Sequence, residues 1–127
     1  MKTLLISEDE ALTRILKSFQ FDENEELLVY DKSSNPLEVV GYIVENSPTI
    51  MIIDDDMITP DTFGVISNIK KMKKDLKIIF VTSNTSIELG KEISPLGISY
   101  YAIKPLDEND FIELLNSLIK NKLKINS

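Results

Sequence analysis

The chain has 127 residues, the usual length of one domain, and its 43% hydrophobic and 28% charged residues indicate a folded domain rather than a disordered segment. Its 21 acidic and 14 basic residues give a formal net charge of −7, which argues against nucleic-acid binding, because such binding depends on neutralising phosphates. Cysteine and histidine are absent, which excludes disulfides, thiolate metal sites and imidazole catalysis and leaves carboxylates, hydroxyls and lysines for any chemistry.

Five short apolar runs alternate with longer stretches of helical spacing. The runs are residues 3–7, 27–30, 49–53, 78–82 and 100–103. Several of them are apolar on consecutive residues, which is typical of parallel strands that are covered on both faces. We therefore expect five parallel strands.

Each expected strand is followed by a segment with the periodicity of a helix. The apolar positions of the first two helices are Ala11, Leu12, Ile15, Leu16 and Phe19, and then Leu37, Val40 and Val44. Those of the later three are Phe63, Ile66, Ile69 and Met72, then residues 87–93, then Phe111, Leu114, Leu115, Leu118 and Ile119. Pro36 suits a first helical turn, and either Asp107 or Asn109 is placed to cap the last helix.

Five strand-then-helix units predict right-handed crossovers and one parallel sheet. We expect an α/β, flavodoxin-like (βα)5 three-layer sandwich with strand order 2-1-3-4-5, whose ligand crevice lies beyond the carboxyl ends of strands 1 and 3. One such domain would fill residues 1–127 and leave no room for an output domain.

Polar residues with a shared chemistry follow the expected strands. An acidic cluster at residues 8–10 follows the first, Asp54 and two further aspartates follow the third, and Thr82 and Lys104 end the fourth and fifth. Clustered carboxylates repel one another and favour a bound cation, and an all-oxygen ligand set suits Mg²⁺. A carboxylate can also attack phosphorus to give an aspartyl phosphate, whose oxygens a lysine and a hydroxyl would stabilise.

These segments resemble the receiver domain of two-component response regulators, the CheY-like family. The resemblance covers nearly the whole chain and is carried by residues 4–10, 48–54, 78–83 and 97–105. It implies that Asp54 accepts a phosphoryl group from a histidine kinase, a phosphotransfer protein or a small acyl phosphate. Thr82 would then move toward the phosphoryl group beside Lys104, and Tyr101 would swing inward, changing the surface of the fourth helix, fifth strand and fifth helix for an unknown downstream protein.

The resemblance also implies a metal site. Glu8 and Asp9 would bind Mg²⁺, Asp9 more directly, together with the side chain of Asp54 and the main-chain carbonyl of Asp56. The resemblance further implies a homodimer through the surface of the fourth helix, fifth strand and fifth helix, as is common in the family.

The segment after Asp54 departs from the family pattern. Family members usually carry a proline four residues after the acceptor and a glycine eight residues after it. Here Ile58 holds the first position, while Pro60 and Gly64 come two residues late, which predicts a longer connection between the third strand and the third helix.

The resemblance implies a signalling switch rather than an enzyme, and two other functions stay open. The altered segment after Asp54 would suit a receiver-like module that binds a partner without phosphorylation. Residues 54–59 also resemble the nucleophile motif of haloacid-dehalogenase-type phosphatases, although in those enzymes the second acidic pair lies downstream. No apolar run approaches the roughly 20 residues that span a bilayer, so we expect no membrane contact, and the absence of cysteine suits a cytoplasmic protein.

Overall fold

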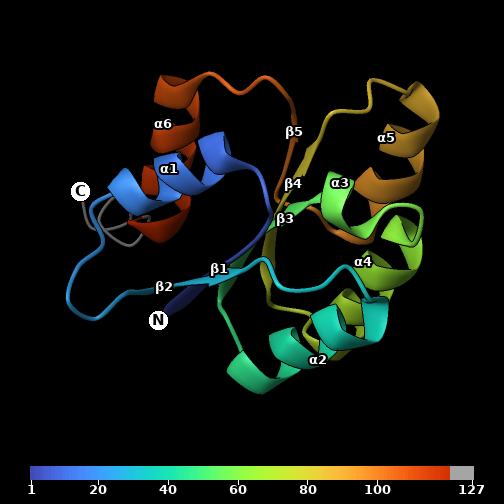
Figure 1. The fold of residues 1–127 in the computed structure, drawn as a ribbon, viewed down its shortest axis with the longest axis horizontal. Helices are drawn as coiled ribbons and strands as arrows, with labels where there is room; N and C mark the ends of the chain where they lie inside the picture. The colour runs from blue at the N-terminus through green and yellow to red at the C-terminus, as the bar shows by residue number, and fades with distance from the viewer. Residues whose placement is uncertain (121–127) are drawn as a thin grey trace.

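The computed structural model describes residues 1–120 and confirms the predicted sheet. Five parallel strands lie in the order β2-β1-β3-β4-β5, and helices cover both faces (Figure 1). The strands are β1 (Lys2–Ile6), β2 (Glu26–Tyr30), β3 (Ile50–Asp54), β4 (Lys77–Thr82) and β5 (Tyr100–Ile103). The helices are α1 (Glu10–Ser18), α2 (Pro36–Asn46), α3 (Asp55–Ile58), α4 (Thr62–Met72), α5 (Ile87–Ile93) and α6 (Glu108–Ile119), with a 3-10 turn at Ser94–Leu96.

The apolar core has two layers, one on each side of the sheet. Successive side chains of a strand point to opposite faces, so Ile52 of β3 packs beneath α1 and α6, whereas Met51 and Ile53 pack against α2 and α4. Figure 1 shows α1 and α6 on one side of the sheet and α2, α4 and α5 on the other. Every residue of β3 is buried, as the run of consecutive apolar residues predicted.

The predicted apolar face of α2 is only partly right, because Val40 packs against the core but Leu37 and Val44 are exposed. Val39 and Ile43 are fully buried, whereas Leu37 is 84% exposed and Val44 is 41% exposed. Leu37 follows Pro36 in the first turn, and the capping side chain of Asn35 holds that turn by accepting hydrogen bonds from the backbone. The sheet therefore meets the helix on the side of Val39 and Ile43, which are one turn apart.

The face of α4 is also only partly as predicted. Ile66 and Ile69 are fully buried, together with Val65, but Phe63 and Met72 at the two ends of the helix are exposed. The remaining helices follow the prediction more closely. The positions buried on α1 and α6 are Leu12, Ile15 and Leu16, and Phe111, Leu115 and Ile119, with Asp107 as the cap of α6.

A short additional helix, α3, follows β3 directly, so the described residues contain six α-helices instead of the predicted five. Asp54 caps this turn, because its Oδ1 accepts a hydrogen bond from the backbone N–H of Asp56 at 3.0 Å. Met57 and Ile58 are buried in the core and anchor the turn. The connection after Asp54, predicted to be longer than usual, thus begins with one short helical turn. None of the helices described is long and apolar enough to cross a membrane.

The two faces of α2 make a direct test possible. Val39→Ala should lower the free energy of unfolding by about 2 kcal/mol, because it removes two buried methyl groups and leaves a cavity. Val44→Ala makes the same change on the exposed face and should alter stability by no more than about 0.5 kcal/mol. Urea unfolding of the two variants measures both values, and equal losses would contradict this orientation of the helix.

Candidate functional site

The carboxyl ends of β1, β3, β4 and β5 meet at one edge of the sheet. The register pairs Ile6 with Ile53, Asp54 with Val81, and Thr82 with Ile103. Just beyond these pairs the chain carries the acidic cluster after β1, the aspartates after β3 and Lys104 after β5. The sheet thus brings together residues that lie up to about 95 positions apart in the sequence.

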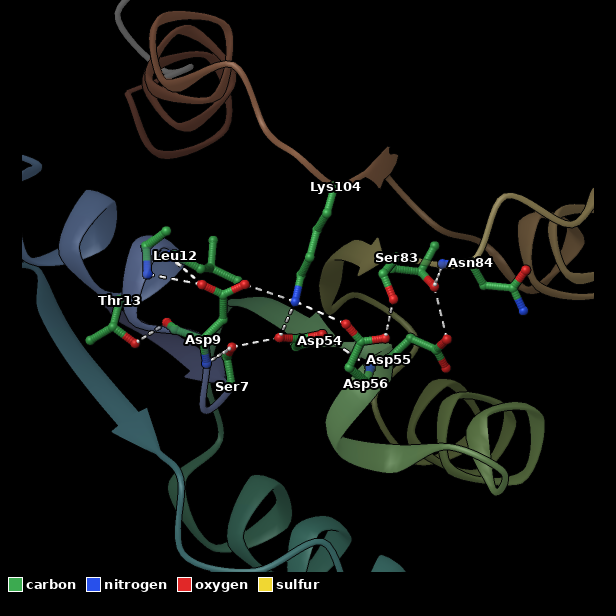
Figure 2. A network of polar contacts seen from close by, with 12 residues as sticks. Ser7, Asp9, Leu12, Thr13, Asp54, Asp55, Asp56, Ser83, Asn84 and Lys104 are labelled. Carbon is green, nitrogen blue, oxygen red and sulfur yellow. Dashed lines mark hydrogen bonds and ion pairs between the residues drawn. The ribbon is translucent and has the colours of Figure 1, made fainter.

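The ammonium of Lys104 lies at the centre of this edge. Its Nζ is 2.9 Å from Oδ2 of Asp9, 2.8 Å from Oδ2 of Asp54 and 3.1 Å from Oδ2 of Asp56. Figure 2 shows Lys104 reaching down between Asp9 on one side and Asp54 and Asp56 on the other. The backbone N–H of Lys104 donates to the carbonyl of Thr82 at 2.8 Å, which fixes the start of its side chain. One cation is therefore shared by three carboxylates.

Asp54 is 2% exposed and is held by donors from three directions. Besides Lys104, its Oδ2 accepts a hydrogen bond from the Ser7 hydroxyl at 2.7 Å, and its Oδ1 accepts the backbone N–H of Asp56. The Ser7 oxygen in turn accepts the backbone N–H of Asp9 at 3.0 Å. Ser7 was not predicted to have a role, although its place as the last residue of the first apolar run was the signal that could have found it.

The other predicted acids surround a small open pocket. Glu8, Asp9, Asp54, Asp56 and Lys104, with Met57, line a space of about 220 Å³. The second oxygen of Asp9 caps α1 by accepting the backbone N–H groups of Ala11 at 2.9 Å and Leu12 at 3.2 Å. Glu8 is exposed at the rim of the pocket.

The donor set at this pocket fits a hard divalent cation. Carboxylate oxygens of Asp9 and Asp54 line it beside Asp56, and Mg²⁺ prefers oxygen ligands of this kind. Within residues 1–120, however, no three acidic side chains are arranged to hold a metal as they stand. The ammonium of Lys104 lies where the carboxylates converge. A metal ion would have to share these oxygens with the lysine.

The protonation equilibria reflect the shared cation. The hydrogen bond from Lys104 lowers the pKa of Asp9, with further lowering from the backbone donors of α1 and a smaller opposing effect of burial. Burial raises the pKa of Asp56, but hydrogen bonds from Ser83 and Lys104 outweigh it and hold that pKa below its usual value. Burial lowers the pKa of Lys104, but the three carboxylates raise it by more, so the net pKa lies above that of a free lysine. The Lys104 ammonium therefore stays charged near neutral pH.

Thr82 lies at the end of β4 as predicted, but its hydroxyl does not face Asp54. It donates to Oδ2 of Asp55 at 2.9 Å and accepts the backbone N–H of Asn84 at 3.0 Å. Asp55 is 4% exposed, and its other oxygen accepts the hydroxyl of Thr62 at the start of α4. Asp55 was predicted only as one more acid of the cluster, and its pairing could not be predicted, because no local pattern shows that Thr62 and Thr82 converge.

Tyr101 lies away from the pocket, on the side of the sheet that faces α4 and α5. Its ring packs on Phe80 with 5.0 Å between ring centroids, and its hydroxyl is buried without a hydrogen-bond partner among residues 1–120. Burial raises the pKa of Tyr101, and the nearby charge of Asp55 raises it further. The hydroxyl already lies inward, beside Gly90 of α5.

Comparison with known proteins gives a consistent result. The family model of the response regulator receiver domain matches residues 4–116. The chain is 30% identical over 125 residues to the probable transcriptional regulator ycf29 of Guillardia theta, which covers 98% of the chain and 55% of that protein. It is 24% identical over 123 residues to the sensory transduction protein LytT of Bacillus anthracis, covering 96% of the chain and 49% of the relative. The chain thus spans about half the length of the curated relatives that it matches.

Solved structures share the fold. A CheY-like response regulator receiver domain protein from Methanospirillum hungatei superposes with a TM-score of 0.77 at 19% identity, covering 97% of the chain and 96% of that structure. A receiver domain protein from Clostridium thermocellum gives a TM-score of 0.73 at 22% identity and covers 98% of both chains. The Mn²⁺-bound form of the response regulator Rcp1 gives 0.69 at 19% identity, with 91% of each chain covered.

The shared ammonium predicts a specific dependence of stability on pH. Because the pKa values of Asp9 and Asp56 are lowered in the folded protein, their contribution to stability is present above the usual carboxyl pKa and is lost as the pH falls below about 5. Lys104→Met should lower the free energy of unfolding near pH 7 by about 2–3 kcal/mol, somewhat less than the cost of breaking a fully buried pair. It leaves carboxylates that repel one another and are relieved by protonation, so the difference from wild type should shrink as the pH falls.

Lys120→Met provides the control for this measurement. It removes an ammonium that pairs with Asp22 at 3.1 Å and Glu25 at 3.0 Å, away from the site, and should keep the pH trend of the wild type. Chemical unfolding of the metal-free proteins between about pH 4 and about pH 8 measures both trends. A wild-type-minus-Lys104→Met difference that grows on acidification would contradict the shared-cation picture.

Proposed function

The chain belongs to the response regulator receiver domain family, and from this membership we propose that it is a phospho-accepting switch in a two-component phosphorelay. Response regulators are signalling proteins that pair with histidine kinases and downstream effectors, rather than classical enzymes. The proposed donor is a histidine kinase or a phosphotransfer protein. The chain spans about half the length of its relatives. The proposal therefore covers the receiver function of this chain, and an activity of the whole relatives would be a further proposal.

The observation that carries the proposal is the position of Asp54. Its carboxylate lies at the pocket and contacts the Lys104 ammonium at 2.8 Å, although the residue is almost fully buried. In the proposed step, an oxygen of this carboxylate attacks the phosphorus of a phosphohistidine. A P–O bond forms, the P–N bond breaks, and the electron pair leaves with the imidazole nitrogen, which takes up a proton.

The neighbouring aspartates are less suited to accept the phosphoryl group. Both oxygens of Asp55 are held by threonine hydroxyls behind the pocket, and the residue is not among those that line it. Asp56 lies at the rim, where its two oxygens take the hydroxyl of Ser83 at 2.8 Å and the ammonium of Lys104. We therefore assign the acceptor role to Asp54 alone.

The residues around Asp54 support the transfer by orientation and by charge. The Ser7 hydroxyl and the backbone N–H of Asp56 fix the carboxylate, and Lys104 can neutralise an oxygen of the phosphoryl group that arrives. Receiver domains generally bind Mg²⁺. Held by Asp9, Asp54 and the main-chain carbonyl of Asp56, with Glu8 nearby, Mg²⁺ would supply further neutralisation of the phosphoryl oxygens.

The proposed output is the surface formed by α5, β5 and α6. Thr82 at the end of β4 and Tyr101 within β5 would transmit phosphorylation to this surface. Apolar side chains are exposed there, with Ile87 72%, Tyr100 47% and Ile103 45% exposed, which suits contact with a downstream protein or a second copy of the chain.

One observation favours the alternative of a receiver-like module that binds its partner without phosphorylation. Tyr101 already lies inward, while the Thr82 hydroxyl is bonded to Asp55. In that case the output surface would be fixed in one form. The family match leaves the phosphatase alternative without support.

Phosphorylation itself is the first test. Incubation with phosphoramidate and Mg²⁺ should add one phosphoryl group, measured by intact mass, because the pocket is open to a small donor. Asp54→Asn should add none, whereas Asp61→Asn removes an exposed aspartate outside the pocket and should be phosphorylated like the wild type. Equal phosphorylation of Asp54→Asn would place the acceptor elsewhere, and no addition to the wild type would favour the phosphorylation-independent module.

Mg²⁺ binding is the second test. Because an ion that binds only the folded state stabilises it by about 2.7 kcal/mol at a hundredfold excess over Kd, Mg²⁺ should raise the melting temperature of the wild type. Lys104→Met should bind Mg²⁺ more tightly, since the lysine no longer competes for the oxygens of Asp9 and Asp54. Asp9→Asn should weaken the effect. Thermal unfolding over a Mg²⁺ series measures all three, and a wild type unaffected by Mg²⁺ would contradict the proposed site.

A further inference from the structure

Asp55 makes a contact that the family resemblance does not assign. It is the first residue of α3, directly after Asp54, and its side chain turns to the opposite side. Figure 2 shows Asp54 facing Lys104, while Asp55 points away toward the strand end that carries Ser83 and Asn84. Its carboxylate is buried, with one oxygen bonded to Thr62 and the other to Thr82. A buried carboxylate needs such donors, because its loss of hydration is otherwise uncompensated.

The contact with Asp55 uses the only proton that the hydroxyl of Thr82 can donate. A threonine hydroxyl has one proton to donate, and here that proton goes to Asp55 Oδ2 at 2.9 Å. The hydroxyl oxygen also accepts the backbone N–H of Asn84 at 3.0 Å, which holds it in place. Thr82 therefore cannot donate to a group on Asp54 while it is bonded to Asp55.

We propose that Asp55 is a positioning residue that holds the Thr82 hydroxyl away from Asp54, so that the phosphoryl group on Asp54 must compete with the Asp55 carboxylate for it. This inference rests on the proposed function, in which Thr82 serves the phosphoryl group. A phosphoryl group carries more charge than a carboxylate and offers three acceptor oxygens, so it can win the competition. Thr62 keeps a bond to Asp55 after the release, so the carboxylate is not left without a donor.

The short helix α3 makes this arrangement possible. Asp54 caps the turn and Asp55 begins it, so adjacent carboxylates face different partners. Met57 and Ile58 anchor the turn in the core and keep Asp55 beneath the end of β4. The proposed restraint on the switch hydroxyl thus comes from the same segment in which the sequence departs from the family pattern.

The test is the initial rate of phosphorylation by phosphoramidate with Mg²⁺, followed by intact mass. Asp55→Leu removes the acceptor, and the rate should rise by about fivefold, the equivalent of one hydrogen bond of ordinary net strength. Asp55→Asn keeps the shape but offers a weaker neutral acceptor, so its rate should rise by a smaller factor. Asp61→Asn removes the same charge from an exposed position before α4 and should leave the rate within about twofold of the wild type.

A double-mutant cycle separates positioning from a merely structural role. In the Thr82→Ala background there is no hydroxyl to release, so Asp55→Asn should no longer change the rate. Melting temperatures of all variants show that each is folded, and Asp55→Asn keeps the test valid if Asp55→Leu does not fold. Unchanged or slower phosphorylation of the Asp55 variants, or the same acceleration without the Thr82 hydroxyl, would overturn the inference.

The wild type distinguishes the two levels of the proposal. If it is phosphorylated on Asp54 and the Asp55 variants are no faster, only the restraint by Asp55 is wrong. If neither the wild type nor any Asp55 variant is phosphorylated, the proposed function fails and the inference fails with it. Phosphorylation of the Asp55 variants alone would support a restraint strong enough to block the switch.

Discussion

The sharing of the Lys104 ammonium by three carboxylates is the constraint on which the rest of the site depends. Asp9, Asp54 and Asp56 reach it from the ends of β1, β3 and α3, so they carry more negative charge than it can neutralise. Uncharged donors supply the remaining compensation. Ser7, Ser83 and the backbone N–H groups of α1 and α3 each donate to one of these carboxylates. The folded protein thus holds an edge that would gain from a further cation.

Thr82 links this charged edge to the interior. Its carbonyl accepts the backbone N–H of Lys104 and so fixes the backbone position from which the lysine side chain extends. Its hydroxyl donates to Asp55. A movement of Thr82 toward Asp54 would therefore affect the same residue that positions Lys104. Tyr101 lies within β5, and its ring packs on Phe80 of the strand that ends at Thr82. The two strands that carry the proposed switch residues are thus directly paired.

The sequence predicted the parts of the molecule that depend on local pattern. Consecutive apolar residues in 49–53 marked a fully buried strand, and the alternation of strands and helices was sufficient for the strand order. The convergence of Asp9, Asp54, Asp56 and Lys104 followed from the sheet, because parallel strands end at one edge. The inward face of α2 could not be read in the same way, since most of its residues are apolar and the side that meets the sheet is set by packing. Neither could the bond between Asp55 and Thr82, which joins side chains 27 residues apart.

The three consecutive aspartates show why that last contact matters. Had residues 54–56 continued as an extended chain, Asp54 and Asp56 would share one face and repel without relief. Beginning a helix at Asp55 turns the second carboxylate toward two threonine hydroxyls and places the third at the rim, where Ser83 and Lys104 meet it. The first keeps the buried position beside Lys104 and caps the turn. One turn of helix therefore gives three chemically identical side chains three environments, and the first two of these environments underlie the separate functions of acceptor and restraint that we propose.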